Sequence, residues 1–113
     1  MTDQTPIACD ITAIDDSERE NHRQAAEDVF AAVSDLRELP DGYGFRLPTE
    51  TKLIQQAGAF ISRERRCCPF FNFALEVKPD RGPVWLKMTG RRGVKQYIEE
   101  TVLPCWNVSK DAS

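Results

Sequence analysis

The chain has 113 residues, with 15 Lys and Arg against 18 Asp and Glu, a formal net charge of -3, one histidine and four cysteines. This length predicts one domain that buries about two thirds of its unfolded surface, and 41% hydrophobic with 29% charged residues is a globular composition, neither disordered nor fibrous. The acidic balance argues against a nucleic-acid partner. No apolar run approaches the about 18 residues that span a bilayer, and the polar start lacks the pattern of a secretory signal. We therefore expect a cytoplasmic protein with reduced thiols and no membrane partner.

The first half of the chain contains signals for two strands and one helix. Alternating apolar residues predict a short strand over Ile7–Thr12. A helical stripe of apolar residues predicts a helix from Ser17 to about Leu36. His22 lies among charged neighbours in the first turns of this helix, and we interpret it as a surface or rim residue and not a catalytic one. Residues 40–42 form a turn, and alternation over Tyr43–Leu47 predicts the second strand.

The second half predicts a helix, a hairpin and a closing helix. The helix begins at Thr49 and ends near Cys68, because the residue before Pro69 is driven out of the α region. Alternating apolar residues over 71–77 and 84–88, separated by a polar loop, predict an antiparallel hairpin. A last helix runs from about Arg91 to Pro104.

The predicted order is β-α-β-α-β-β-α, which indicates an α+β two-layer sandwich with a four-stranded antiparallel or mixed sheet and helices on one face. We expect a single domain over residues 1–106 and a flexible polar tail over 107–113. On the other face of the sheet we expect Phe70 and Trp85, which form an exposed apolar strip suited to a homodimer or a protein partner unless the tail with Trp106 covers it.

One group of residues carries a chemical signal at the end of the second predicted helix: Glu64, Cys67 and Cys68. Counted at about 100° per residue from Leu53, these three fall at about 20°, -40° and 60°, the sector of the apolar stripe. Burying an unpaired carboxylate is costly. Glu64 therefore needs a partner, either a cation, an indole N–H such as that of Trp85 or Trp106, or a metal.

Two adjacent sulfurs suit a soft metal or metalloid ion such as Zn(II), Cu(I), Hg(II) or As(III). In this hypothesis Cys67 and Cys68 are the ligands, and Glu64 is a third ligand or the acceptor that orients them. Neighbouring arginines favour thiolates, whereas the negative end of the helix dipole disfavours them. A closed tetrahedral site needs a further sulfur from Cys9, Cys105 or a partner chain. Those arginines are Arg63, Arg65 and Arg66.

Three alternatives stay open from the residues alone. Cysteine packs well in cores, so Cys67 and Cys68 could end the apolar stripe while Glu64 bridges to an arginine, and we interpret Cys9 as a core residue. A thiol redox sensor would pair Cys67 and Cys68 with each other, or with Cys9 or Cys105. A dimerisation or protein-interaction module would need no cysteine chemistry. We expect a domain that is not an enzyme and that binds a soft ion.

The stretch from Glu64 to Phe70 also resembles a group of small bacterial proteins with no assigned activity. Their pattern is Glu-Arg-x-Cys-Cys-Pro-Phe, followed by a hairpin and a closing helix. The resemblance covers about Tyr43 to Val102. It implies handling of heavy metals, because relatives lie near or are fused to metal-responsive regulators. The residues that match further along are Phe73-Ala74-Leu75, Trp85-Leu86, Thr89-Gly90 and Gly93-Val94-Lys95.

Overall fold

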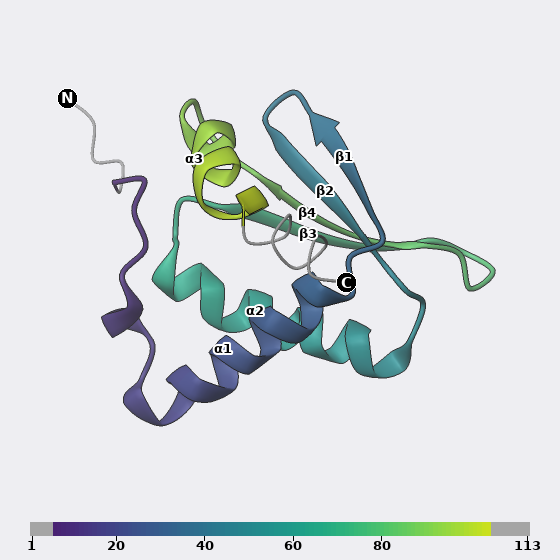
Figure 1. Ribbon diagram of the computed structural model, residues 1–113, viewed down its shortest axis with the longest axis horizontal. Coiled ribbons are helices and arrows are strands. Elements are labelled where there is room, and N and C mark those ends of the chain that lie inside the picture. Colours follow the sequence, from purple (N-terminus) through teal and green to yellow (C-terminus); the bar gives the residue numbers. More distant parts are fainter. Residues whose placement is uncertain (1–5, 105–113) are drawn as a thin grey trace.

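The computed structural model describes residues 6–104, which form an α+β structure with a four-stranded sheet and three α-helices (Figure 1). Cys105, Trp106 and the predicted tail lie outside these residues. Along the chain the elements are the short 3-10 helix η1 (Ile11–Ala13), α1 (Asp16–Ala31), β1 (Asp35–Leu39), β2 (Gly42–Leu47), α2 (Thr51–Cys67), β3 (Asn72–Val77), β4 (Val84–Thr89) and α3 (Val94–Thr101).

The sheet has the strand order β1-β2-β4-β3, and all of its neighbours are antiparallel. Residues 40 and 41 form the tight turn between β1 and β2, and residues 78–83 connect β3 to β4. The central pair brings Phe45 of β2 opposite Leu86 of β4. The predicted fold class is therefore confirmed, with the antiparallel rather than the mixed sheet.

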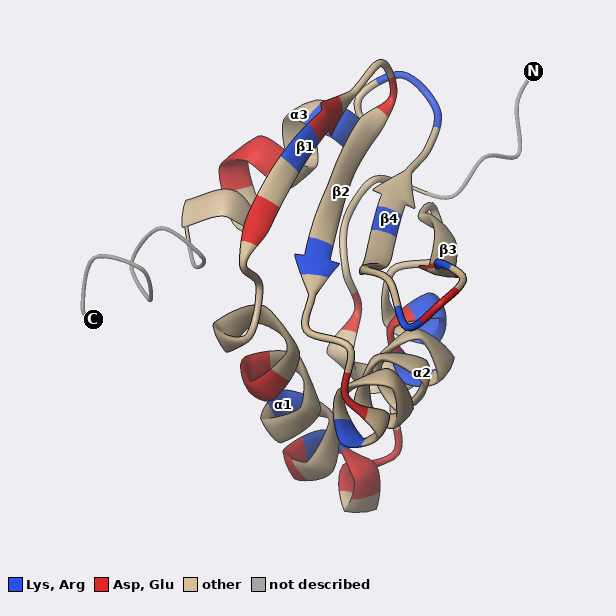
Figure 2. Ribbon diagram, turned by 90° about the vertical axis from the view of Figure 1, so that its right-hand side faces the viewer, with Lys and Arg blue, Asp and Glu red and all other residues tan. Residues whose placement is uncertain are grey.

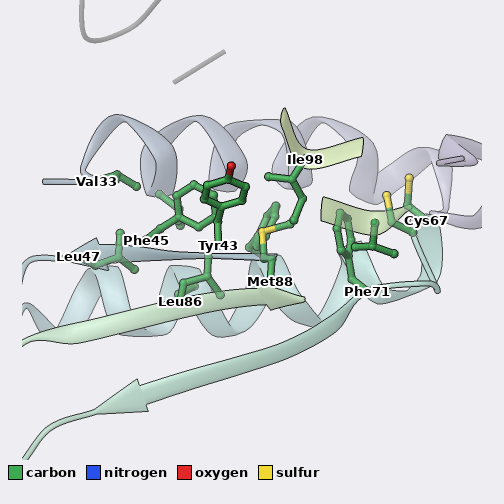
Figure 3. Close-up of a cluster of buried hydrophobic side chains, with 14 of the residues drawn as sticks. Val33, Tyr43, Phe45, Leu47, Cys67, Phe71, Leu86, Met88 and Ile98 are labelled. Carbon is green, nitrogen blue, oxygen red and sulfur yellow. The ribbon is translucent and has the colours of Figure 1, made fainter. Parts of the chain in front are cut away.

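The sheet packs one face against the helices, and the core lies between these two layers. On this face β2 and β4 place side chains that alternate along each strand, as a half-buried sheet requires. Figure 3 shows several of them packed against Ile98 of α3 and against Val33, which follows the end of α1. The buried sheet residues on this face are Tyr43, Phe45, Leu47, Val84, Leu86 and Met88, and those of the helices include Val29, Ala57, Phe60, Val94 and Ile98.

All three helices cover this same face. Helices α1 and α2 pack side by side along it (Figure 1). Helix α3 covers the end of the sheet near the β1–β2 turn, where the Tyr43 hydroxyl donates to Glu99 Oε2 at 2.7 Å. Lys95 Nζ also donates to Glu38 Oε2 of β1 at 2.6 Å. These polar contacts fix α3 against the first hairpin.

The predicted strand over Ile7–Thr12 is wrong. The Asp10 carboxylate accepts a hydrogen bond from the Thr12 N–H at 3.0 Å, which opens η1 in place of a strand. The remaining strand of the sheet is instead Asp35–Leu39, which overlaps the end of the predicted first helix at Asp35 and Leu36. That helix ends at Ala31, and residues 35–39 pair with β2 in the sheet instead of continuing the helix. The observed order is α-β-β-α-β-β-α.

The predicted exposed strip of Phe70 and Trp85 is also wrong. Phe70 belongs to the core. Trp85 does lie on the helix-free face, yet it is only 4% exposed. Its ring packs over Gly44, where a Cβ would lie 3.3 Å from the indole, and the Arg37 guanidinium carbon lies 4.3 Å from the ring centroid. Among the described residues, the large hydrophobic side chains that are exposed are those of Ile11 and Val77.

The visible charges are mixed in sign. In the view of Figure 2, Asp and Glu alternate with Lys and Arg along β1 and α1. Within residues 6–104, no helix combines the length and the apolar character that crossing a bilayer requires.

Candidate functional site

Three sulfurs converge at the carboxyl-terminal end of α2. The Sγ atoms of Cys9, Cys67 and Cys68 all lie within 4.8 Å of one another. Cys67 is the last residue of α2 and Cys68 is its C-cap. Cys9 arrives from the amino-terminal segment, which passes this end of the helix (Figure 1). The Asp10 N–H donates to the Cys67 carbonyl at 2.9 Å and holds the segment in place.

Two of these cysteines are bonded as a disulfide. Cys9 and Cys68 are 59 positions apart in the sequence, and their Cα atoms are 4.6 Å apart. Cys67 is free and buried. The interpretation of Cys9 as a core residue is wrong, because Cys9 is exposed. The structure brings it to Cys68, one of the pairings that the sequence left open.

The cluster has one accessible side. Cys68 is fully buried and Cys67 is 5% exposed, beside the ring of Phe71 (Figure 3). At exposed Cys9, the Tyr97 hydroxyl donates to Sγ at 3.0 Å. A reagent from solution therefore meets Cys9 first.

Glu64 joins the sulfurs to a buried histidine. Its Oε2 lies 3.4 Å from Cys68 Sγ, and its Oε1 lies 2.7 Å from His22 Nε2. A cysteine in a disulfide carries no hydrogen, so the Cys68 thiol donates to Glu64 only when the disulfide is reduced. The helical spacing therefore placed Glu64 and Cys68 correctly on one face. The ligand roles of Glu64, Cys67 and Cys68 stay a prediction.

His22 is the partner of Glu64 that the sequence reasoning missed. It is only 5% exposed, so its interpretation as a surface residue is wrong. Its ring stacks on Phe60 with centroids 5.5 Å apart, and its Nδ1 has no hydrogen-bond partner among the described residues. The sequence does contain an indication that His22 is buried. It lies three and seven positions before Ala25 and Val29, which belong to the buried stripe of the helix.

The nearby arginines do not ionise the free thiol. Arg63 Nε and Arg66 Nη2 donate instead to Glu18 Oε1, at 3.3 and 3.4 Å. Burial, and then the negative charge of Glu64, raise the pKa of Cys67. The expectation that arginines stabilise a thiolate is therefore wrong at Cys67. A bound cation would supply the missing positive charge, because it deprotonates a coordinating thiol.

Comparison with protein-family models, with curated proteins and with solved structures gave no match.

Proposed function

We propose that the reduced protein binds a soft metal or metalloid ion through Cys9, Cys67 and Cys68. The observation that carries this proposal is the approach of three sulfurs to within 4.8 Å, from two segments far apart in the sequence. Thiolates select soft ions. The ion would occupy the position between the sulfurs when the disulfide is open.

The spacing suits such an ion. A Zn–S bond of about 2.3 Å places two tetrahedral sulfur ligands about 3.8 Å apart. In the reduced protein Cys9 and Cys68 would separate to that distance, and Cys67 would approach by a small side-chain rotation. Low exposure of Cys67 and Cys68 disfavours hydrated hard ions, which keep their water ligands.

Glu64 has a supporting role in this proposal. Its carboxylate accepts from the Cys68 thiol before binding and would take up the displaced proton, with His22 behind it. Cys67 and Cys68 are the vicinal pair of the Glu-Arg-x-Cys-Cys-Pro-Phe pattern. The resemblance to small bacterial proteins with that pattern stays a prediction, and the proposal does not depend on it.

Titration of the reduced protein with Hg(II), As(III) and Zn(II) tests this function. Thiolate coordination produces charge-transfer absorbance in the near ultraviolet, and we expect saturation at one ion per chain. Cys9→Ser and the double variant Cys67→Ser/Cys68→Ser should each weaken binding by at least about tenfold, about 1.4 kcal/mol.

Cys105→Ser is the matched control, because Cys105 is the remaining cysteine of the chain. This variant should bind as the wild type does. If the wild type responds to none of the ions, or if Cys105→Ser abolishes binding while Cys9→Ser does not, the proposal is wrong.

The Cys9–Cys68 disulfide supports a second candidate, a thiol redox switch. Two thiols and one peroxide molecule would give the disulfide and two water molecules. Mass spectrometry after mild peroxide treatment should find the Cys9 and Cys68 peptides joined, with the loss of two hydrogen atoms. A protein that stays reduced, or that pairs Cys67 with Cys68, contradicts this candidate.

A further inference from the structure

A cavity of about 590 Å³ is lined by Glu64, which lies one helical turn before Cys68 on α2. It opens between α1, α2, β4 and the end of α3, and its walls are largely apolar. The residues that matter here are Ala26, Phe30, Phe60, Met88, Val102 and Glu64. The cavity falls within the size range of about 300–1,000 Å³ of small-molecule sites.

Glu64 connects this cavity to the sulfur cluster. The residue lines the cavity, and its Oε2 is 3.4 Å from Cys68 Sγ. The other oxygen is held by His22, whose ring packs flat on Phe60, a second residue of the cavity wall. The Glu64 carboxylate therefore borders the apolar space on one side and contacts the Cys68 sulfur on the other.

From this juxtaposition we infer that the ligand is an organometallic or organometalloid species, with its soft atom on the sulfurs and its hydrocarbon group in the cavity. This inference rests on the proposed function and names its substrate class. An apolar cavity of about 150 Å³ already accommodates a benzene ring. A phenyl group therefore fits the space beside Phe30 and Phe60.

The chemistry at the sulfurs is a ligand exchange that needs no oxidant or reductant. Phenylarsonous acid, PhAs(OH)2, reacts with the thiols of Cys68 and Cys9. Two As–S bonds form, two As–O bonds break, and two water molecules leave with the two thiol protons. The arsenic–carbon bond stays intact. Inorganic arsenite, As(OH)3, has no hydrocarbon group and would use the Cys67 thiol as its third ligand.

A comparison of two ligands and two variants distinguishes binding in the cavity from binding at the sulfurs. Dissociation constants for phenylarsonous acid and arsenite are measured on the reduced full chain in a Cys105→Ser background. Ala26→Phe places a ring in the cavity. Ala74→Phe adds the same ring on the helix-free face of the sheet, where Ala74 is exposed opposite Lys87, and it is the matched control.

Ala26→Phe should weaken the binding of phenylarsonous acid about thirtyfold. This fold-change corresponds to losing about 2 kcal/mol from burial of the phenyl group. Arsenite binding should change by less than about twofold, and Ala74→Phe should affect neither ligand. Cys67→Ser should show the reverse pattern, with a larger loss for arsenite. Ala26→Leu, a smaller addition, replaces Ala26→Phe if thermal melting shows that the latter does not fold.

The inference is overturned if filling the cavity leaves the phenyl ligand unaffected, or weakens both ligands equally, while the wild type still binds arsenite. In that outcome the soft-ion function itself stands. If the wild type binds neither ligand, the proposed function fails together with the inference.

Discussion

At the scale of single residues, the pair formed by Glu64 and His22 connects the site to stability. Both side chains are largely buried, at 17% and 7% exposure, and the two groups are 2.7 Å apart. Removing one member leaves the other desolvated without its partner, which costs about 1–3 kcal/mol. The pair should therefore behave as one unit in unfolding experiments.

A double-mutant cycle with His22→Ala and Glu64→Ala tests this coupling by urea unfolding. We expect each single variant to lose about 2 kcal/mol of unfolding free energy and the double variant to lose clearly less than the sum. Additive losses, with no coupling energy, would show that the two side chains act independently.

Tyr43 should titrate abnormally. Its hydrogen bond to Glu99, then its burial and the charges of Glu99 and Glu38, raise its pKa to about 12. Because the pKa in the folded state is raised, the stabilisation is fully present below the ordinary value of 10.0 and is lost as the pH rises through about 12.

Ultraviolet absorbance of the tyrosinate checks this value. Glu99→Gln keeps a hydrogen-bond acceptor and removes the charge, so the Tyr43 transition should move toward lower pH. Tyr43→Phe should flatten the loss of stability between pH 10 and 12. A Tyr43 transition near its ordinary pKa, unmoved by Glu99→Gln, would contradict the contact.

At the scale of elements, the disulfide joins the amino-terminal segment to the end of α2. Closing a loop between cysteines 59 positions apart restricts the unfolded chain and stabilises the folded state by about 4 kcal/mol in the chain-entropy model. The oxidised protein should therefore unfold at a higher urea concentration than the reduced protein.

The redox dependence of the urea midpoint should disappear in Cys9→Ser and in Cys68→Ser and persist in Cys105→Ser. A midpoint that is the same for oxidised and reduced wild type would show that the segment carrying Cys9 contributes no constraint to folding.

Much of this arrangement of elements follows from local patterns. The apolar stripe of α2 placed Glu64 and Cys68 on one face, and alternation placed the β3–β4 hairpin. Strand β1 was missed because its five residues, DLREL, are mostly exposed and charged, while Leu36 also continued the apolar spacing of α1. The turn at residues 40–42 was predicted correctly. A β-hairpin at that turn requires a strand before it as well as after it, and this requirement points to β1.

Only part of the site could be predicted from the sequence, for a different reason. Glu64, Cys67 and Cys68 are neighbours on one helix, so their proximity follows from helical geometry. Cys9 and His22 reach them through tertiary packing, across 59 and 42 positions. No local pattern encodes such contacts. The spacing of His22 from the buried residues of α1 nevertheless indicates a buried rather than a surface position.

At the scale of the whole molecule, ion binding, oxidation and stability are linked. The disulfide uses two of the three sulfurs, so a soft ion should bind and stabilise only the reduced protein. At an ion concentration about one hundred times the dissociation constant, the gain is about 2.7 kcal/mol, or about 10 °C in Tm for a domain of this size.

Thermal melting with and without arsenite checks this linkage in both redox states. The reduced wild type should show the increase in Tm, reduced Cys9→Ser should show a clearly smaller one, and the oxidised wild type should show little or none. Equal increases in the oxidised and reduced protein would mean that the ion binds elsewhere.

X-ray absorption spectroscopy of arsenite bound to the reduced protein counts the ligands of the ion itself. With Cys105→Ser as the background, we predict three sulfur neighbours in the wild-type cluster and two after Cys9→Ser. A first shell of oxygen, or a sulfur count that Cys9→Ser leaves unchanged, would contradict a site built from Cys9, Cys67 and Cys68.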